Sequence, residues 1–281
     1  MSAPPSSPPP STVPAGATDR WFYACLGLLG GVYALLILAL LVADASFTSP
    51  GAVFRALANR EIRYAIRLSL ISCSLTTLLS LWAAVPIGYL MSRTQFPGKA
   101  LLDALLDVPI VLPPLVIGLS LLILFQTPPG RLIERLLPVT YAIPGVVLAQ
   151  FTVACAFAVR TMNVTFNQIN PRTEQVALTL GCRRSQAFWL IVLPEARRGL
   201  LTAATLAWAR ALGEFGPLLV FCGATRLKTE VMPTTVFLEL SVGNLEAAVA
   251  VSLLMVVAAV AVLLIIRLFG YVPALGQSLR P

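Results

Sequence analysis

The sequence predicts an all-α, polytopic membrane protein with about six transmembrane helices. Of its 281 residues, 58% are hydrophobic and only 11% are charged, and its mean hydropathy is +0.86. A soluble domain would carry about 25% charged residues. Several uncharged runs also reach the length of about 20 residues that a helix needs to cross a bilayer.

The predicted spans follow a polar beginning. Residues 1–18 are rich in proline and serine, cannot bury a core and are expected to form a disordered tail. The uncharged run 21–43 is longer than the about 7–15 residues of a signal-peptide core. Segment 19–60 is therefore interpreted as the first transmembrane helix with an outer loop. Further spans are expected at 68–92, 108–130, 136–159, 199–225 and 247–266, within a core of residues 61–270 that precedes a C-terminal tail, 271–281.

The net charge of +8 bears on membrane topology. Lys and Arg gather on the cytoplasmic loops of membrane proteins, so the basic balance requires no nucleic-acid partner. A small excess of these residues favours cytoplasmic N- and C-termini. The basic cluster between Arg55 and Arg67 runs against this rule, because it falls on the outer side.

Residue types needed for several kinds of chemistry are missing. The chain has no histidine, and its five cysteines occur singly. No metal site and no Ser-His triad are therefore expected. The nearest approach to a phosphate-binding loop, GATRLKT at 223–229, lacks the second glycine of GxxxxGK[ST]. The chain is expected to hold no catalytic residues and no cofactor. If ATP drives this protein, ATP and Mg²⁺ must bind to a partner ATPase.

The long cytoplasmic loop between the fourth and fifth predicted spans contains a polar segment, residues 170–194. Asn170 fits the N-cap of a short helix, with Pro171 at the first helical position. Gly181 is expected to end that helix in the left-handed conformation. Three apolar residues at helical spacing give the helix one apolar face: Val176, Ala177 and Leu180.

A second short helix is expected at about 185–192, with Phe188, Trp189 and Ile191 as its apolar residues. Pro194 is expected in the first turn of the next membrane helix, where its missing N–H costs nothing. From periodicity alone, an amphipathic loop lying on lipid headgroups is an equally good interpretation of the whole segment.

The same segment resembles the cytoplasmic signature of inner-membrane permeases from binding-protein-dependent ABC importers, E-A-A-x3-G-x9-I-x-L-P. The residues that match it in register are Ala177, Gly181, Ile191, Leu193 and Pro194. Gln175 and Val176 depart from the first two positions, and Glu174 stands one place early. An opening of this kind is similar to that of molybdate-type permeases.

The resemblance implies that segment 170–194 couples the permease to a separate ATP-binding subunit. Val176, Leu180 and Phe188 would supply apolar contact, and charged residues would orient the partner. The residues assigned to coupling are Glu174, Gln175, Ala177, Gly181, Arg183, Arg184, Phe188, Ile191, Leu193 and Pro194.

Two further stretches extend the resemblance and are assigned to the translocation path or its gate. DVPIVLPPLVIGLSLL at 107–122 contains an LPP-x-V-x-G run like that of molybdate and sulfate permeases, although a proline kink for packing is an alternative. ARALGEFGPLLVF at 209–221 places two charges inside a span, where charges are costly. The residues assigned here are Pro113, Pro114, Arg210, Gly213, Glu214, Phe215 and Gly216.

Arg210 and Glu214 are spaced to pair on one helix face. They could form a purely structural pair, or lie at the gate or its hinge. Gly213 and Gly216 would permit close approach of another helix.

The resemblance implies the type I permease fold of ABC importers and the import of a tetrahedral oxyanion by alternating access, molybdate or tungstate first and sulfate second. It also implies an ABC ATPase subunit, a second permease subunit (the same or a homologue) and an extracytoplasmic substrate-binding protein as partners within the lipid bilayer. The binding protein would dock on segments 44–63 and 226–244. Two alternatives remain open: an ATP-independent secondary transporter, and a membrane scaffold that recruits a soluble protein.

Overall fold

The computed structural model describes residues 17–270, and every regular element in that range is helical. It divides into two compact units, one ending at Phe47 and one beginning at Thr48, which are described separately. The two tails expected at 1–18 and 271–281 lie outside the described residues, except that Ala17 and Thr18 begin the first helix.

The first unit is the helix α1 (Ala17–Phe47). From Trp21 onward almost every side chain is exposed, and the exposed side chains are apolar on all sides of the helix. A helix that is hydrophobic all round requires an apolar surrounding, which a bilayer supplies. The span expected at 21–43 is therefore confirmed as one apolar helix of sufficient length.

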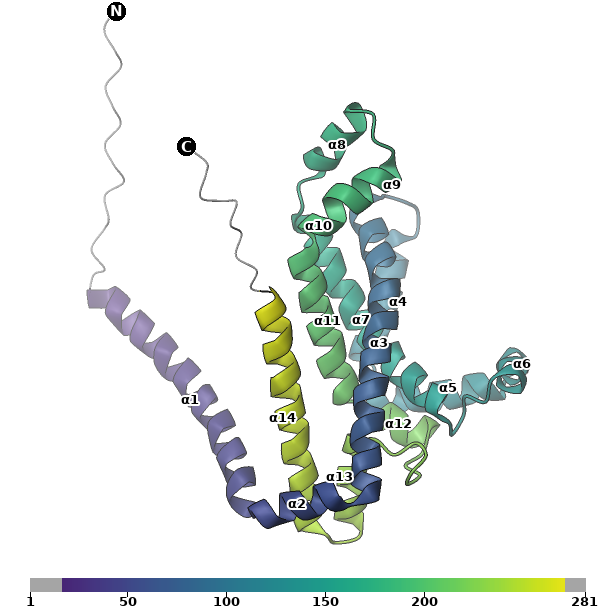
Figure 1. Ribbon diagram of the computed structural model, residues 1–281. Helices are drawn as coiled ribbons and strands as arrows, with labels where there is room; N and C mark the ends of the chain where they lie inside the picture. Colours follow the sequence, from purple (N-terminus) through teal and green to yellow (C-terminus); the bar gives the residue numbers. More distant parts are fainter. Residues whose placement is uncertain (1–16, 271–281) are drawn as a thin grey trace, which may run out of the picture. The chain divides into compact units, whose positions relative to one another are not determined.

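The second unit is built around three long helices that lie side by side, α3 (Arg60–Arg93), α7 (Ile143–Gln168) and α11 (Arg197–Leu212) (Figure 1). Small residues set their spacing. A Cβ atom on Gly88 of α3 would lie 2.8 Å from the Cβ of Met162 and 2.9 Å from the backbone nitrogen of Asn163. These three helices could not pack so closely with larger residues at such points.

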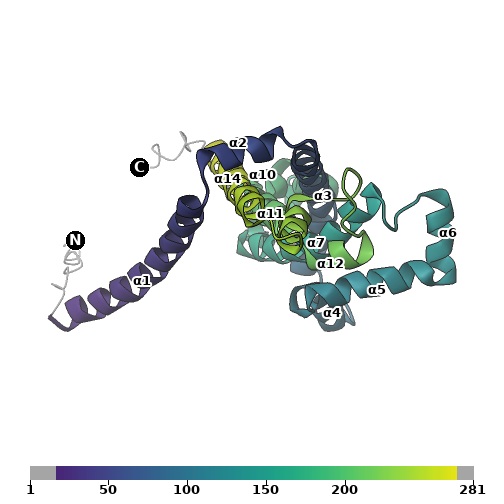
Figure 2. The same ribbon diagram turned by 90° about the horizontal axis from the view of Figure 1, so that it is seen from below.

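The span expected at 108–130, in which a proline kink was one of the two interpretations, is broken in the structure. It consists of α4 (Lys99–Val111) and α5 (Pro114–Gln126), bent by 111°. Pro113 and Pro114 cause the break, because each proline forces the residue before it into an extended conformation. Figure 2 shows α5 leading away from α3 and α7 toward α6 (Pro128–Leu136).

The fourth expected span, 136–159, also begins later than predicted. Its helix, α7, starts at Ile143, because residues 137–142 form a loop in which Tyr141 has a left-handed φ of 54°. The fifth, expected at 199–225, is divided between α11 and α12 (Gly216–Phe221).

The remaining helices complete the unit. α2 (Pro50–Ala58) is joined to α14 (Leu245–Gly270) by an ion pair between Arg55 and Glu246 at 2.7 Å. α13 (Met232–Ser241) packs against α14. At the opposite end of the second unit from α2 lie α8 (Pro171–Thr179), α9 (Arg184–Ala187), the π-helix η1 (Phe188–Val192) and α10 (Leu193–Glu195) (Figure 1).

Among the described residues, four helices are long and apolar enough to cross a membrane, and the bent α4–α5 pair adds a fifth if it counts as one span. They are α1 from Trp21, α3, α7 and α14 up to Ile266. The all-α, polytopic class is confirmed, while the count of about six spans stays a prediction because the fifth expected span is interrupted.

We expect Gly88→Val to destabilise the second unit by about 1–3 kcal/mol, because the added carbons overlap the backbone of α7. Gly31→Val in α1 is the control, since no atom other than those of its chain neighbours and its own helix backbone lies within 4 Å of the position of its added Cβ. The measurement is the thermal unfolding midpoint of each variant in the same detergent. Equal midpoints for the two variants would contradict the close packing of α3 on α7.

Candidate functional site

The first half of segment 170–194 folds as expected. The Asn170 side chain accepts a hydrogen bond from the backbone N–H of Arg172 at 3.0 Å, and Pro171 occupies the first turn of α8. Gly181 has a left-handed φ of +90° and ends α8 in a Schellman motif. The backbone N–H of Cys182 donates to the Ala177 carbonyl and that of Gly181 to the Leu178 carbonyl, each at 3.1 Å. The helix, its N-cap and its left-handed glycine are confirmed.

The second short helix, expected at about 185–192, is confirmed by α9 and η1, which together span Arg184–Val192, but it does not end there. A single helical stretch runs from Arg184 to Glu195 through α9, η1 and α10, and Ala196 separates it from α11. Pro194 therefore does not lie in the first turn of the next membrane helix. Before the proline, the backbone N–H of Leu193 bonds to the Phe188 carbonyl, one residue further back than in an α-helix. Pro194 has no backbone N–H to donate, and its ring would clash with the preceding turn of an α-helix. The wider turn before it lets the helix continue through this proline.

Three residues hold the segment to the end of α3, and we call them the Glu174 cluster: Tyr89, Arg93 and Glu174. The Tyr89 hydroxyl donates to Glu174 Oε1 at 2.5 Å, and Arg93 Nε lies 3.4 Å from Glu174 Oε2. The Arg93 and Glu174 side chains are only 12% and 13% exposed. Arg93 Nη2 also donates to the Ile169 carbonyl at 3.0 Å. The start of α8 is thus tied to α3 by charge-assisted hydrogen bonds.

Phe188 packs inward, although it was expected to contact a partner. Its ring lies 4.8 Å from that of Tyr89 and 6.4 Å from that of Phe166, measured between centroids. The exposed apolar residues of the segment are Val176, Leu180, Trp189 and Leu190. Val176 and Leu180 are therefore free for contact as predicted, and Trp189 and Leu190 add surface that the prediction had not assigned.

Other coupling residues vary in exposure. Gln175, Arg183, Arg184 and Pro194 are exposed, whereas Ile191 and Leu193 are half-buried and Ala177 is buried. Among the described side chains, Arg183 and Arg184 make no salt bridge. The charge of Glu174, by contrast, is already paired within the chain. Its expected role in orienting a partner stays a prediction.

The two stretches assigned to the translocation path meet each other. A Cβ on Gly216 would lie 2.9 Å from the Cβ of Pro114 and 3.0 Å from the nitrogen of Leu115. On the next turn, a Cβ on Gly118 would lie 2.8 Å from the Cα of Pro217. The breaks before α5 and before α12 are therefore in direct contact, and the close approach predicted for Gly216 is confirmed.

Gly213 does not have the role expected of it. The atoms nearest to its added Cβ are carbonyl oxygens of its own helix, at 3.7 and 4.0 Å, so no other helix approaches there. Gly213 ends α11 with a φ of −81°, which other residues also adopt. Phe215, after it, packs against Phe237 with 5.3 Å between ring centroids.

The predicted pairing of Arg210 with Glu214 is confirmed, at 2.6 Å. Glu214 is 1% exposed, while Arg210 is partly exposed and its guanidinium carbon lies 5.7 Å from the centroid of the Phe157 ring. The pair neutralises a carboxylate that is buried at the break between α11 and α12, and loss of Arg210 would leave that charge unpaired. A role at the gate stays a prediction.

Gln150 was missed by the sequence analysis and connects three helices. Its Nε2 donates to the carbonyl of Ala211 in the last turn of α11 at 3.2 Å, and its Oε1 accepts from the Thr76 hydroxyl of α3 at 3.2 Å. The amide thereby adds a second donor to a carbonyl at the end of an interrupted helix, which also accepts from the backbone N–H of Glu214 at 3.3 Å. The sequence signal that could have identified Gln150 is its position as an isolated glutamine in an otherwise apolar run.

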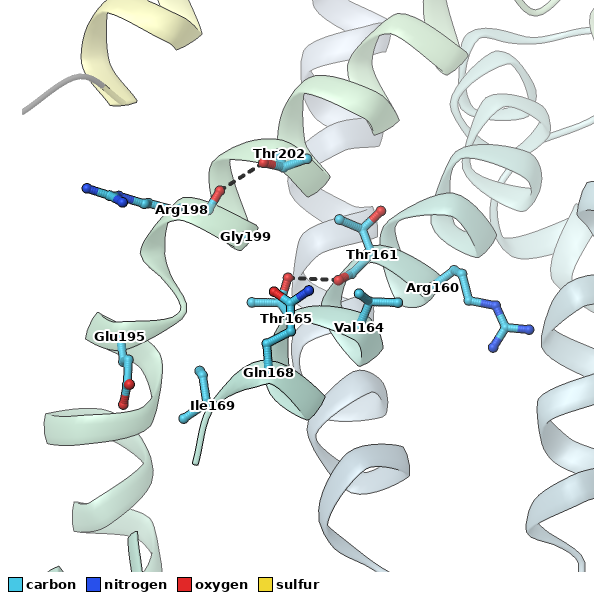
Figure 3. Close-up of a pocket in the computed structure, with 10 residues that line it drawn as sticks. All are labelled: Arg160, Thr161, Val164, Thr165, Gln168, Ile169, Glu195, Arg198, Gly199 and Thr202. Atoms are coloured by element: carbon cyan, nitrogen blue, oxygen red, sulfur yellow. Dashed lines mark hydrogen bonds between the residues drawn. The ribbon is translucent and has the colours of Figure 1, made fainter. Parts of the chain in front are cut away.

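A cavity of about 630 Å³ lies between the end of α7 and the start of α11, near the coupling segment (Figure 3). Its polar lining includes three threonine hydroxyls, and each donates to a carbonyl of its own helix: Thr161, Thr165 and Thr202. Figure 3 shows the Arg160 and Arg198 side chains extending away from Thr165 in opposite directions. Strong anion sites aim donors at the anion, and these three hydroxyls are already occupied by helix carbonyls.

Among the described residues, no group of three or more histidine, cysteine, aspartate or glutamate side chains could hold a metal ion.

Comparisons with known proteins identify similar chains. A family model described as the inner membrane component of binding-protein-dependent transport systems matches residues 84–272. A probable molybdenum ABC transporter permease protein of Haloferax volcanii is 34% identical over 246 residues, covering 88% of this chain and 90% of that protein. The sulfate transport system permease protein CysT of Salmonella typhimurium is 32% identical over 221 residues, covering 78% of this chain and 80% of CysT.

The fold is also similar to a chain of a bacterial ABC transporter involved in the import of the acidic polysaccharide alginate. The TM-score is 0.72 with 14% sequence identity, over 90% of this chain and 96% of that one. At this identity the likeness concerns the fold alone.

We expect Gln150→Leu to destabilise the protein by about 1 kcal/mol, because the Ala211 carbonyl and the Thr76 hydroxyl lose a buried partner. Gln168→Leu, the same chemical change at an exposed position near the end of α7, is the matched control. Unfolding midpoints in detergent measure the difference. If both variants unfold alike, Gln150 does not stabilise the end of α11.

Proposed function

Since the chain belongs to the family of inner membrane components of binding-protein-dependent transport systems, we propose that it carries a tetrahedral oxyanion, molybdate or tungstate, across the cell inner membrane. It is a permease of an ABC importer and not an enzyme, because ATPase activity in these transporters belongs to a separate subunit. The observation that carries the choice of substrate is the 34% identity, over 88% of the chain, to a probable molybdenum permease.

Sulfate is the second candidate substrate. It is favoured by the 32% identity to CysT over 78% of this chain. Molybdate, tungstate and sulfate share a charge of −2 and a tetrahedral shape, so one path could pass any of them. Selection would then rest with an extracytoplasmic binding protein, in keeping with a cavity whose hydroxyls do not point donors inward.

The coupling segment would transmit the motion of a partner ATPase. Val176, Leu180 and Trp189 would be buried against the ATPase, because together they form exposed apolar surface beside the unpaired Arg183 and Arg184. Hydrolysis of ATP, with Mg²⁺, would take place entirely on that partner. No step of the transport cycle requires a reaction on this chain.

Two connections would carry the motion into the membrane. The Glu174 cluster joins α8 to α3, and the nearly continuous helical stretch from α9 to α10 leads into α11. At its far end α11 stops beside Glu214, where the following α12 touches Pro114. Displacement of segment 170–194 would therefore shift the two contacting breaks, which we assign to the gate of an alternating-access cycle.

The experiment that tests the function isolates the chain from its native membrane in mild detergent and identifies bound proteins by mass spectrometry. We expect a P-loop ATPase near one-to-one, a binding protein, and either no second permease or a homologous one. Uptake of molybdate, tungstate and sulfate by cells lacking and regaining the chain then ranks the substrates. Absence of any ATPase, even after crosslinking, would contradict the coupling role and favour a scaffold or a secondary transporter.

We expect Tyr89→Phe and Glu174→Gln each to lower the amount of anion transported per ATP hydrolysed several-fold, because both weaken the connection from α8 to α3. Binding of the ATPase should persist, since the exposed apolar surface is unchanged. The double variant should be little worse than either single variant, because the two side chains act together.

Tyr33→Phe, at an exposed tyrosine of α1, is the control for loss of a hydroxyl. Transport and ATP hydrolysis are measured together in proteoliposomes. An unchanged ratio in both single variants would show that the Glu174 cluster does not carry the motion.

We expect Gly181→Val to abolish most transport while membrane insertion survives, because a branched residue at a φ of +90° costs about 1–2 kcal/mol and turns α9 away from α8. Gly98→Val is a closely matched control. Gly98 has a φ of +87° and, like Gly181, open space around its Cβ position, but it lies outside the coupling segment.

Gly181→Asn should retain most activity, because asparagine tolerates the left-handed region. Oxyanion uptake and the amount of protein in the membrane are the two measurements. Equal uptake by the Gly181→Val and Gly98→Val variants would contradict a special role for the turn.

A further inference from the structure

A basic pocket lies at the end of α3 remote from the coupling segment, and we call it the arginine pocket. It is a cavity of about 440 Å³ lined by Arg60, Arg63, Tyr64 and Arg67 of α3 and by Leu227. Figure 1 shows the start of α3 at the opposite end of the second unit from α8 and α9. Three guanidinium groups thus share one hollow of the surface.

None of the three arginines has an acidic partner among the side chains that the structure describes. The only acid in the first two turns of α3, Glu61, is bound by Arg226, which also pairs with Glu239 at 3.0 Å. The hydrogen bond that Arg226 donates to Glu61 raises the pKa of the Arg226 guanidinium. Arg226 therefore stays charged and keeps Glu61 paired. The positive charge of the pocket is therefore not neutralised from within.

This arrangement is unfavourable for the isolated fold. Arg60 and Arg63 lie in the first turn of a long helix, whose positive N-terminal end repels cations. Arg63 and Arg67 are spaced four apart, so two like charges face each other on one side of the helix. The arginines also oppose the rule that places basic residues on the cytoplasmic side. A bound anion would offset the first two of these effects, because both are electrostatic.

The wall opposite the arginines is held in a fixed conformation. Leu227 has a left-handed φ of 58°, which is strained for a leucine. The Thr225 carbonyl accepts hydrogen bonds from the backbone N–H groups of Lys228, Thr229 and Glu230, and the Tyr64 hydroxyl donates to the Lys228 carbonyl at 3.2 Å. The pocket is therefore a defined cavity between α3 and an ordered turn, with Lys228 beside it.

We propose that the arginine pocket binds a tetrahedral oxyanion on the extracytoplasmic face of the permease. Guanidinium groups bind tetrahedral oxyanions through paired N–H donors, and three of them match the charge of −2 with an excess. The assignment to the outer face rests on the proposed function, which puts the coupling segment in the cytoplasm. The anion has two possible sources with one chemistry, the free transported oxyanion and the phosphate of an anionic lipid headgroup.

If the free oxyanion is the occupant, the pocket concentrates substrate beside the outer end of the permease. A cluster of one sign of charge raises the local concentration of an oppositely charged ligand and its rate of association. If a lipid phosphate is the occupant, the pocket instead fixes the start of α3 in the outer leaflet.

The experiment compares two variants that each lose two positive charges. Arg63→Gln/Arg67→Gln changes the pocket, and Arg131→Gln/Arg135→Gln changes two exposed arginines of α6 as the matched control. The full chain is purified in detergent and freed of lipid, and binding of molybdate and of sulfate is measured by equilibrium dialysis. A second sample, purified directly from membranes containing phosphatidylglycerol, is examined for retained lipid by native mass spectrometry.

We expect oxyanion binding, or retention of phosphatidylglycerol, to fall at least about tenfold in the pocket variant and to stay within about twofold in the control. Loss of oxyanion binding identifies the free anion as the occupant, and loss of lipid alone identifies the headgroup. The proposal is overturned if neither ligand binds to the wild-type chain, or if both variants weaken binding equally.

The binding measurement involves neither ATPase nor binding protein, so it can fail independently of the proposed function. If the wild-type chain recovers its ATPase but binds no anion, only the arginine pocket is wrong. If it binds the anion through this pocket but recovers no ATPase, the site stands and its assignment to an importer is wrong.

Discussion

The close packing of α3 against α7 is the constraint on which the rest of the second unit depends. This packing is possible because Gly88 has no side chain, and the space that a Cβ would need is taken by Met162 and Asn163. The ends of these two helices then lie together, so that Tyr89 and Arg93 of α3 and Phe166 of α7 form one surface for the coupling segment. A wider separation of α3 and α7 would disrupt the surface that Glu174 and Phe188 both contact.

Interrupted helices are tolerated in this membrane protein because other groups bond to the freed backbone. The break after α11 is supported by Gln150, whose amide donates to the Ala211 carbonyl, and by the ion pair of Arg210 with Glu214. The break before α5 is closed by contact with Gly216. Water is scarce inside a bilayer, so each unbonded backbone group in a membrane-spanning segment would be costly.

Charge is distributed in two distinct ways. Arg93, Arg160, Arg210 and Arg226 all have carboxylate partners, and these pairs join segments of the chain or support a break. The arginines of the arginine pocket have none among the described residues. The arginine pocket differs from the other exposed arginines in that three of these side chains line one cavity, and this clustering underlies the proposed anion site.

Local chemistry in the sequence by itself determined the apolar spans of α1, α3 and α14, the cap at Asn170, the turn at Gly181 and the pairing of Arg210 with Glu214. Each depends on residues within a few positions of one another, where periodicity, φ preference and helix spacing decide the outcome. Only the tertiary structure decided that Phe188 packs inward, that Gly216 rather than Gly213 meets another helix, and that Gln150 supports α11. Those contacts join residues far apart in the sequence, and they exist because of how closely, and at what angle, the helices pack.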